Sequence, residues 1–388
     1  MKINRSLLAR LREALQLPKT FPTVRRMNPD DIAKTIDHAL ASAGLHRAQS
    51  NEPPIRDLRT PSATPKPGEH AEVQTDRGEF LTRSFSNDAG TRSYKLYVPS
   101  SHSSASNEPA ALVVMLHGCT QSPDDFAAGT RMNALAERHG FLVVYPAQAP
   151  NANGSRCWNW FRGEDQRRDH GEPSLIAGIT REVAAGYRVD ERCIFVAGLS
   201  AGAAMAVILG ATYPDIYSAV GAHSGLPYGV AHDVPSAFAA MKGTRAQAGR
   251  SSPLGGPPAH PAANRPMPTI VFHGDNDQTV VVRNGDAIVE QASVGFPGQA
   301  TLRATVSEGE TSSGRTYRRA VYADSEGLPV VEHWLLHGAG HAWSGGSPSG
   351  TFTDGSGPDA SSEMIRFFHA RARARGIEGN ADARGFAD

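Results

Sequence analysis

A serine in the stretch GLSAG is the clearest candidate for a chemical role in this chain. Gly198, Ser200 and Gly202 fit the pattern G-x-S-x-G, with an apolar run before them and a helix-forming run after them. A serine on such a turn sits in a strained backbone conformation, and small neighbours let the flanking backbones approach closely. A plain packing junction of small residues is the alternative, so the motif needs partners before it predicts a nucleophile.

The partners that a serine nucleophile needs are a histidine and a carboxylate. The hydroxyl is a weak nucleophile until an imidazole accepts its proton, and the carboxylate orients that imidazole. In a strand–turn–helix architecture the acid and the histidine follow the serine in that order, each on a loop after a strand. FHGDND supplies Asp275 and Asp277, and LLHGAGH supplies His337 and His341.

Within each pair, one residue fits the catalytic role better. His341 lies on a loop of small residues that leaves it free to reach the serine, whereas His337 is closer to its strand and fits a structural role. Asp275 fits an Asx-type hydrogen bond that stabilises a turn. We therefore predict Asp277 as the acid and His341 as the base.

Acyl transfer also requires donors for the negative charge that develops on the carbonyl oxygen. One predicted donor is the backbone N–H of Ala201, directly after the nucleophile. The second is expected on the loop after an early strand, where VVMLHGCTQS places Gly118 and Cys119. Gly118 allows the backbone to turn inward, so the predicted donor is the N–H of Cys119, whose thiol need not react.

The elements that must position these residues alternate between strand and helix. A hairpin is predicted at 78–99. Further strands are predicted at 111–118, 141–146, 193–198, 217–225, 268–277 and 330–338, and helices at 124–139, 173–187, 201–212 and 359–374. Such alternation predicts an α/β protein with a mostly parallel sheet and helices on both faces.

Composition divides the chain into three parts. Residues 1–45 are predicted to form a short N-terminal helical extension with two helices, and 46–75 a proline-rich linker. The remaining residues, 76–388, are predicted to form the catalytic domain. A stretch rich in glycine, alanine and proline at 244–267 fits an insertion within that domain.

The charge balance and the motifs present exclude several classes of partner. The 39 basic and 39 acidic residues leave no basic surface for nucleic acid, and no run of 18 apolar residues predicts a transmembrane segment. Charged residues interrupt the first apolar stretch, so no signal peptide is predicted and a cytoplasmic location is expected, with export by another route as the alternative. The sequence contains no H-E-x-x-H motif, and we predict neither a metal nor an organic cofactor.

Five motifs together resemble the polyhydroxybutyrate depolymerase family of esterases, which includes feruloyl and acetyl-xylan esterases. They are LHGCTQS, SRCWNWF, GLSAG, FHGDNDQTV and GAGHAW, and the resemblance covers roughly residues 78–374. It implies an α/β-hydrolase fold, a triad of Ser200, Asp277 and His341, and the two oxyanion amides named above. The implied substrate is an ester, either a small molecule or a polyester.

Three tryptophans near these motifs are candidates for lining an acyl pocket. Trp158 and Trp160 lie in CWNWF, and Trp343 follows His341 by two residues. The alternative is that these indoles cover the core.

Two cysteines lie beside motifs assigned to the site, Cys119 in the oxyanion loop and Cys157 in the aromatic loop. We hypothesise a disulfide between them that fixes the oxyanion amide and leaves Cys193 outside the bridge. The alternative is a set of unrelated thiols. A bridge would favour an oxidising compartment, extracellular or periplasmic, over the cytoplasm.

Two rival functions use the same features. A serine peptidase of this fold shares the triad, but the sequence shows no propeller-type repeats. A catalytically silent binding protein would usually lack a member of the triad, whereas all three candidates are present. The sequence therefore favours a serine esterase.

Overall fold

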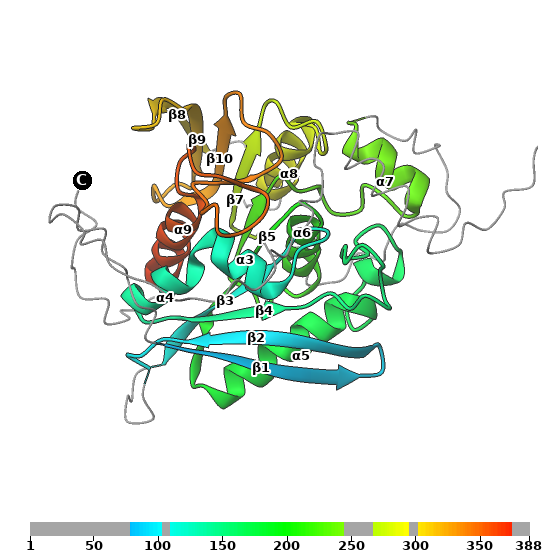
Figure 1. Cartoon of the computed structure of the whole chain (residues 1–388). Coiled ribbons are helices and arrows are strands. Elements are labelled where there is room, and N and C mark those ends of the chain that lie inside the picture. The colour runs from blue at the N-terminus through cyan, green and yellow to red at the C-terminus, as the bar shows by residue number, and fades with distance from the viewer. Residues whose placement is uncertain (1–77, 103–108, 244–266, 295–301, 375–388) are drawn as a thin grey trace, which may run out of the picture.

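A ten-stranded sheet runs through the part of the chain that the computed structural model describes, residues 78–102, 109–243, 267–294 and 302–374. Its strands are β1 (Glu79–Asn87), β2 (Gly90–Val98), β3 (Ala110–Leu116), β4 (Leu142–Pro146), β5 (Val189–Leu199), β6 (Ala219–His223), β7 (Thr269–Gly274), β8 (Arg303–Glu310), β9 (Thr316–Ala323) and β10 (Pro329–Leu336). The spatial order is β1-β2-β4-β3-β5-β6-β7-β10-β9-β8 (Figure 1). The predicted N-terminal extension, the linker and most of the predicted insertion lie outside the described residues.

Strands β4, β3, β5, β6, β7 and β10 are parallel to one another, and the edges of the sheet are antiparallel. The hairpin β1–β2 forms one edge, and β9 and β8 form the other. In an open parallel sheet, ligands bind beyond the carboxyl ends of the strands. The loops after β3, β5, β7 and β10 meet at that edge, and they carry the predicted site residues.

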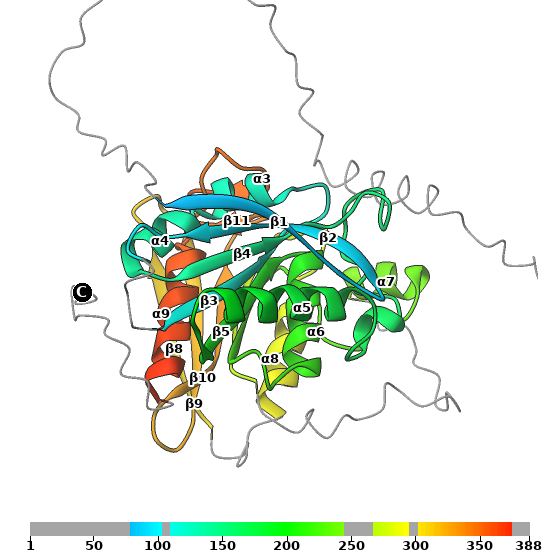
Figure 2. The ribbon, with the colours of Figure 1, turned by 90° about the horizontal axis from the view of Figure 1, so that it is seen from below.

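Helices cover both faces of this sheet. They are α3 (Pro123–Thr130), α4 (Met132–His139), α5 (Gly171–Gly186), α6 (Ala201–Thr212), α7 (Val234–Met241), α8 (Arg283–Val294) and α9 (Ala360–Ala374), with a 3-10 turn η1 (Glu164–Gln166) and a short pair β11 (Trp343–Ser344) and β12 (Thr353–Asp354). Side chains alternate along a strand, so Val114 of β3 packs in the core with α5, α6 and α8, whereas Val113 packs with α3, α4 and α9. Figure 2 shows helices α5, α6 and α8 on one side of the sheet and α3, α4 and α9 on the other. The predicted fold class is confirmed.

The single helix predicted at 124–139 is wrong, because the chain breaks into α3 and α4 at Arg131. This residue has a left-handed conformation with φ of 55°, and its N–H donates to Ala127 O. Its guanidinium donates to Gly345 O at 2.7 Å. The break was not predictable from the local sequence, since arginine is a good helix former and the contact that uses it is distant in the chain.

Helices α7 and α8 and strands β8 and β9 were not predicted. Helix α7 begins with a capping box, in which Asp233 accepts a hydrogen bond from Ser236 N, and has a proline in its first turn. That spacing is a signal the sequence does contain. Strand β8 is largely exposed, so it lacks the apolar alternation that marks a half-buried strand. Within the described ranges, no helix combines the length and the apolarity needed to cross a bilayer.

Buried histidines stand at the carboxyl ends of several strands. His117 follows β3, His223 ends β6, and both are almost fully buried. Burial lowers the pKa of His117 to about 4 and that of His223 to about 3, so both rings are neutral in the folded protein. In the unfolded chain the pKa of a histidine is about 6.5. Around and below that pH the unfolded state therefore binds more protons than the folded state, and the free energy of unfolding decreases as the pH falls.

We therefore expect the free energy of unfolding to decrease on acidification. Each of His117 and His223 contributes a loss of about 2 kcal/mol between pH 7 and pH 5, because only the unfolded state is protonated there. Urea unfolding at the two pH values measures this loss. As a control, the variant His223→Gln has no imidazole at this position, and its pH-dependent loss should be smaller by about 2 kcal/mol. An equal loss in the variant and the unsubstituted protein would contradict the assignment.

Candidate active site

Ser200 occupies the sharp turn between β5 and α6. Its φ of 57° and ψ of −119° lie in a region that L-residues rarely adopt. The conformation is held on both sides, because Ser200 N donates to His223 O at 2.9 Å and Ser200 O accepts from Ala204 N at 3.0 Å. The strained turn expected from the motif is present, and it places Ser200 at the N-terminus of α6.

The glycines on either side of Ser200 are required by space. A Cβ on Gly202 would lie 2.1 Å from the carbonyl oxygen of Leu116, at the end of β3. A Cβ on Gly198 would lie 2.5 Å from backbone atoms of Gly202. Helix α6 therefore approaches the end of β3 as closely as backbones allow, which brings the loop after β3 against the serine.

Asp277 and His341 form a buried pair. The Nδ1 of His341 donates to Asp277 Oδ2 at 2.7 Å, and the other carboxylate oxygen accepts from the amides of Thr279 and Val280, each at 2.9 Å. Burial raises the pKa of Asp277, but the charge and hydrogen bond of His341 outweigh it and hold that pKa below its ordinary value. The carboxylate is thus ionised at neutral pH, and with Nδ1 as the donor, Nε2 of His341 is the basic nitrogen.

Asp275 and His337 form a second, separate pair. Their side chains meet at 2.9 Å, and Asp275 also accepts from the amide of Gly338 at 2.7 Å. Both side chains are well exposed, at 37% and 40%. This pair ties the loop after β7 to the loop after β10. The Asx-type bond predicted for Asp275 differs from these contacts, and it is Asp277 that accepts from the amide two residues on, Thr279 N.

The loop after β3 packs directly against the serine. A Cβ on Gly118 would lie 3.7 Å from the Cβ of Ser200. Amides on both sides of Cys119 are engaged: Gly118 N donates to Gln121 Oε1 at 2.9 Å, and Thr120 N donates to Ser155 O at 2.7 Å. Hydrogen bonds therefore fix the residue before Cys119 and the residue after it, so the backbone amide of Cys119 lies on a well-held loop.

His117 sets the orientation of the Gly118–Cys119 peptide. Its Nε2 accepts from the amide of Gln148 at 3.1 Å, so the proton of the neutral ring is on Nδ1, which donates to Gly118 O at 2.7 Å. In a trans peptide the carbonyl and the following N–H point in opposite directions. The N–H of Cys119 therefore points away from His117.

The predicted disulfide between Cys119 and Cys157 is present, with Cα atoms 4.2 Å apart. It joins the oxyanion loop to the aromatic loop. The third cysteine, Cys193, is buried in β5, outside the bridge. The indole Nε1 of Trp158 adds another tie, because it donates to His117 O at 3.1 Å.

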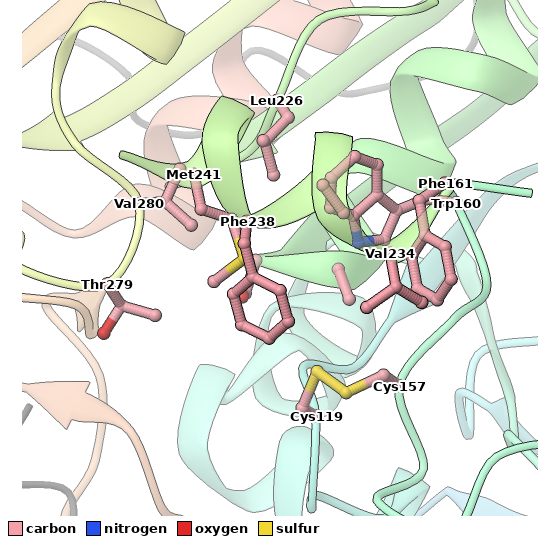
Figure 3. Close-up of a pocket in the computed structure, with 13 residues that line it drawn as sticks. Cys119, Cys157, Trp160, Phe161, Leu226, Val234, Phe238, Met241, Thr279 and Val280 are labelled. Carbon is pink, nitrogen blue, oxygen red and sulfur yellow. A yellow bond between two sulfur atoms is a disulfide. The ribbon is translucent and has the colours of Figure 1, made fainter. Parts of the chain in front are cut away.

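Ser200 is one of the residues that line an apolar pocket. Figure 3 shows this pocket with the Cys119–Cys157 disulfide at one side. Its walls come from the disulfide, the aromatic loop, helix α7 and the turn after Asp277. The lining residues are Cys119, Cys157, Trp160, Phe161, Ser200, Ala201, Leu226, Val234, Ala237, Phe238, Met241, Thr279 and Val280. Ser200 and the turn after Asp277 thus line one cavity. The part of the lining that comes from α7 was not predicted from the sequence, because helix α7 was not predicted.

Of the three tryptophans predicted to line a pocket, only Trp160 is in this lining. Trp158 is fully buried and supports the oxyanion loop through His117. Trp343 is also buried: its ring stacks on His223, and its Nε1 donates to Ser361 Oγ at 3.1 Å. For Trp158 and Trp343 the expectation is wrong, because both indoles find polar partners inside the core.

A buried carboxylate holds the aromatic loop in place. Glu172 accepts from the backbone and side-chain nitrogens of Asn159, both at 2.7 Å, and faces Arg92 at 3.4 Å. Asp165 accepts from Glu172 N at 2.7 Å. Burial, followed by the charge of Glu172, raises the pKa of Asp165 to about 7. These bonds fix the segment between Cys157 and α5, which carries Trp160 into the pocket.

Comparisons with known proteins identify similar sequences and structures. Residues 92–312, more than half of the chain, match the family described as "Esterase PHB depolymerase". The chain is 34% identical to the poly(3-hydroxyalkanoate) depolymerase C of Paucimonas lemoignei over 243 residues, which cover 60% of this chain and 55% of that protein. It is 27% identical to a probable acetylxylan esterase A of Aspergillus fumigatus over 237 residues, covering 58% of this chain and 61% of that protein.

The chain spans little more than half the length of the curated relatives that it matches. Among solved structures, an acetyl xylan esterase from Aspergillus awamori superimposes with a TM-score of 0.56 at 19% identity, covering 76% of this chain and all of that one. The sheet order, the helices on both faces and this likeness show an α/β-hydrolase fold. The chain belongs to the esterase PHB depolymerase family.

Proposed function

We propose that this chain hydrolyses carboxylic esters through an acyl-enzyme, with Ser200 as nucleophile, His341 as general base and Asp277 as its orienting acid. The observation that carries the proposal is the buried Asp277–His341 pair at the carboxyl edge of the sheet, where Ser200 also lies on its strained turn. Family membership supports the same chemistry.

The reaction follows from these positions. Ser200 Oγ attacks the ester carbonyl carbon while His341 Nε2 accepts the hydroxyl proton. The resulting tetrahedral intermediate collapses, the C–O bond to the alcohol breaks, and the alcohol leaves with the proton from His341. A water molecule then attacks the acyl-enzyme in the same way, which releases the acid and restores Ser200. Asp277 stabilises the imidazolium at both stages.

The amides of Ala201 and Cys119 are proposed as donors to the oxyanion. Ala201 is the first residue of α6, so its N–H has no acceptor within the helix, and the helix N-terminus favours negative charge. Cys119 is fixed by the disulfide, and His117 orients its peptide. Donors fixed in advance need no reorganisation when charge develops, which is how such sites lower the barrier.

The triad is tested by two matched sets of variants. Ser200→Ala, His341→Ala and Asp277→Asn should each lower kcat for p-nitrophenyl butyrate by about 10⁴-fold or more, because triad members act as a unit. The controls Asp275→Asn and His337→Gln alter the exposed pair and should keep kcat within about 3-fold of the parent. Circular dichroism checks folding. A larger loss in Asp275→Asn than in Asp277→Asn would show that the acid is assigned wrongly.

The apolar lining of the pocket favours an ester with an apolar acyl group. Apart from Ser200, the lining residue with a side-chain hydroxyl is Thr279, and aliphatic and aromatic side chains dominate the rest. An internal unit of a poly(3-hydroxyalkanoate) carries no free hydroxyl, since each is esterified to the next unit. The apolar lining and the name of the similar depolymerase support such a polyester as the substrate to test first, with acetylated xylan as the second.

Phe238 is expected to set the length of the acyl chain. Figure 3 shows its ring between Val280 and the disulfide, within the pocket. Truncation should lengthen the space, so Phe238→Ala should raise kcat/KM for p-nitrophenyl octanoate relative to the acetate by about 10-fold. Phe80→Ala, on the distant strand β1, is the control and should leave this ratio unchanged. An unchanged ratio in Phe238→Ala would argue against this pocket as the acyl site.

We further propose that the protein works in an oxidising compartment, extracellular or periplasmic. The Cys119–Cys157 disulfide supports this, because stable disulfides are rare where thiols are kept reduced. The cytoplasmic location expected from the first residues of the sequence has no support in the structure.

A further inference from the structure

His223 contacts two separate parts of the proposed catalytic apparatus. It is the last residue of β6 and is fully buried. Its carbonyl oxygen accepts from Ser200 N at 2.9 Å, and its ring nitrogen Nε2 accepts from Ser344 N at 3.0 Å. One residue thus bonds the backbone of the nucleophile and the backbone three residues after His341.

Stacking fixes the plane of the His223 ring. The ring lies 5.8 Å from the ring of Phe272 with an interplanar angle of 11°, and 5.3 Å from Trp343 at 27°. Phe272 belongs to β7, which leads to Asp277, and Trp343 follows His341. Because the ring is held by both neighbours, its Nε2 lone pair stays directed at the Ser344 amide.

The ring must be neutral to accept that bond. Nε2 is the acceptor, so the proton is on Nδ1, which faces Ser224 Oγ at 3.3 Å. Burial lowers the pKa of His223, and the charges of His273 and His341 lower it further. The acceptor is therefore retained over the pH range in which an enzyme with a histidine base works.

We infer that His223 is a positioning residue that sets the separation between Ser200 and the loop of His341. The inference rests on the proposed function, since it assumes that these two side chains exchange a proton. Its basis is the pair of hydrogen bonds, one from the main chain of His223 and one from its side chain. A displacement of about 1 Å between reacting groups can cost about 100-fold in rate, so the side-chain bond to Ser344 is expected to act on kcat.

The test compares two substitutions of nearly equal shape. In His223→Gln, the side-chain oxygen can occupy the place of Nε2 and accept from Ser344 N. In His223→Met, a chain of similar length has no comparable acceptor. Both variants lose the stacked ring, so the acceptor is the main difference between them. The Met variant leaves the buried Ser344 N–H without its acceptor and should lose some stability, so kcat is compared at a temperature well below the unfolding transition of both variants.

We expect His223→Met to lower kcat for p-nitrophenyl butyrate by about 10- to 100-fold with KM within about 3-fold, and His223→Gln to retain kcat within about 3-fold of the parent. Thermal unfolding is measured in parallel, because a purely structural role would make activity follow stability. Parent-like kcat in the Met variant, equal losses in both variants, or a loss confined to KM would overturn the inference.

The Ser200→Ala variant separates this result from the proposed function. If Ser200→Ala is inactive and the Gln and Met variants do not differ in kcat, Ser200 is supported as the nucleophile and the positioning role of His223 is rejected. If Ser200→Ala keeps the parent activity, the proposed function itself falls, and the inference with it.

Discussion

The close contact between the start of α6 and the end of β3 is the constraint on which the rest of the site depends. Gly202 fits against the carbonyl of Leu116 with no room for a Cβ. This contact fixes the turn that holds Ser200 at positive φ, and it brings Gly118 against the serine. The nucleophile, the helix N-terminus and the oxyanion loop are therefore positioned by one backbone packing arrangement, and the acid and histidine loops are placed beside them by the parallel order β5-β6-β7-β10.

Two neutral histidines extend this arrangement by the same physical means. His117 accepts from Gln148 N and donates to Gly118 O, and His223 accepts from Ser344 N. Burial disfavours the charged ring, so each imidazole keeps its acceptor nitrogen and its bond to a backbone amide. His341, on the loop after β10, combines burial with a carboxylate partner at 2.7 Å, whereas His337 on the same loop is exposed and pairs with Asp275. Burial without a close carboxylate thus distinguishes the positioning histidines from the proposed catalytic one.

The central strands and the candidate catalytic residues could be predicted from the sequence because both depend on local signals. Apolar runs mark the buried strands, and GLSAG, FHGDND and LLHGAGH each begin at the end of one of them. The break at Arg131 and the inward packing of Trp158 and Trp343 could not be predicted, since each depends on a contact with a residue distant in sequence. The contacts of His223 were missed for the same reason. The residues next to it in the sequence form an ordinary strand, and its two partners, Ser200 and Ser344, lie in segments distant from it in the sequence.

The most direct test of the account is a crystal structure of the protein after reaction with a p-nitrophenyl phosphonate ester, which mimics the tetrahedral intermediate. We expect a covalent bond from Ser200 Oγ to phosphorus, with the phosphoryl oxygen at about 2.7–3.1 Å from the amide nitrogens of both Cys119 and Ala201. His341 Nε2 should lie within hydrogen-bond distance of Ser200 Oγ. An adduct on a different residue, or a phosphoryl oxygen directed away from both amides, would contradict the account.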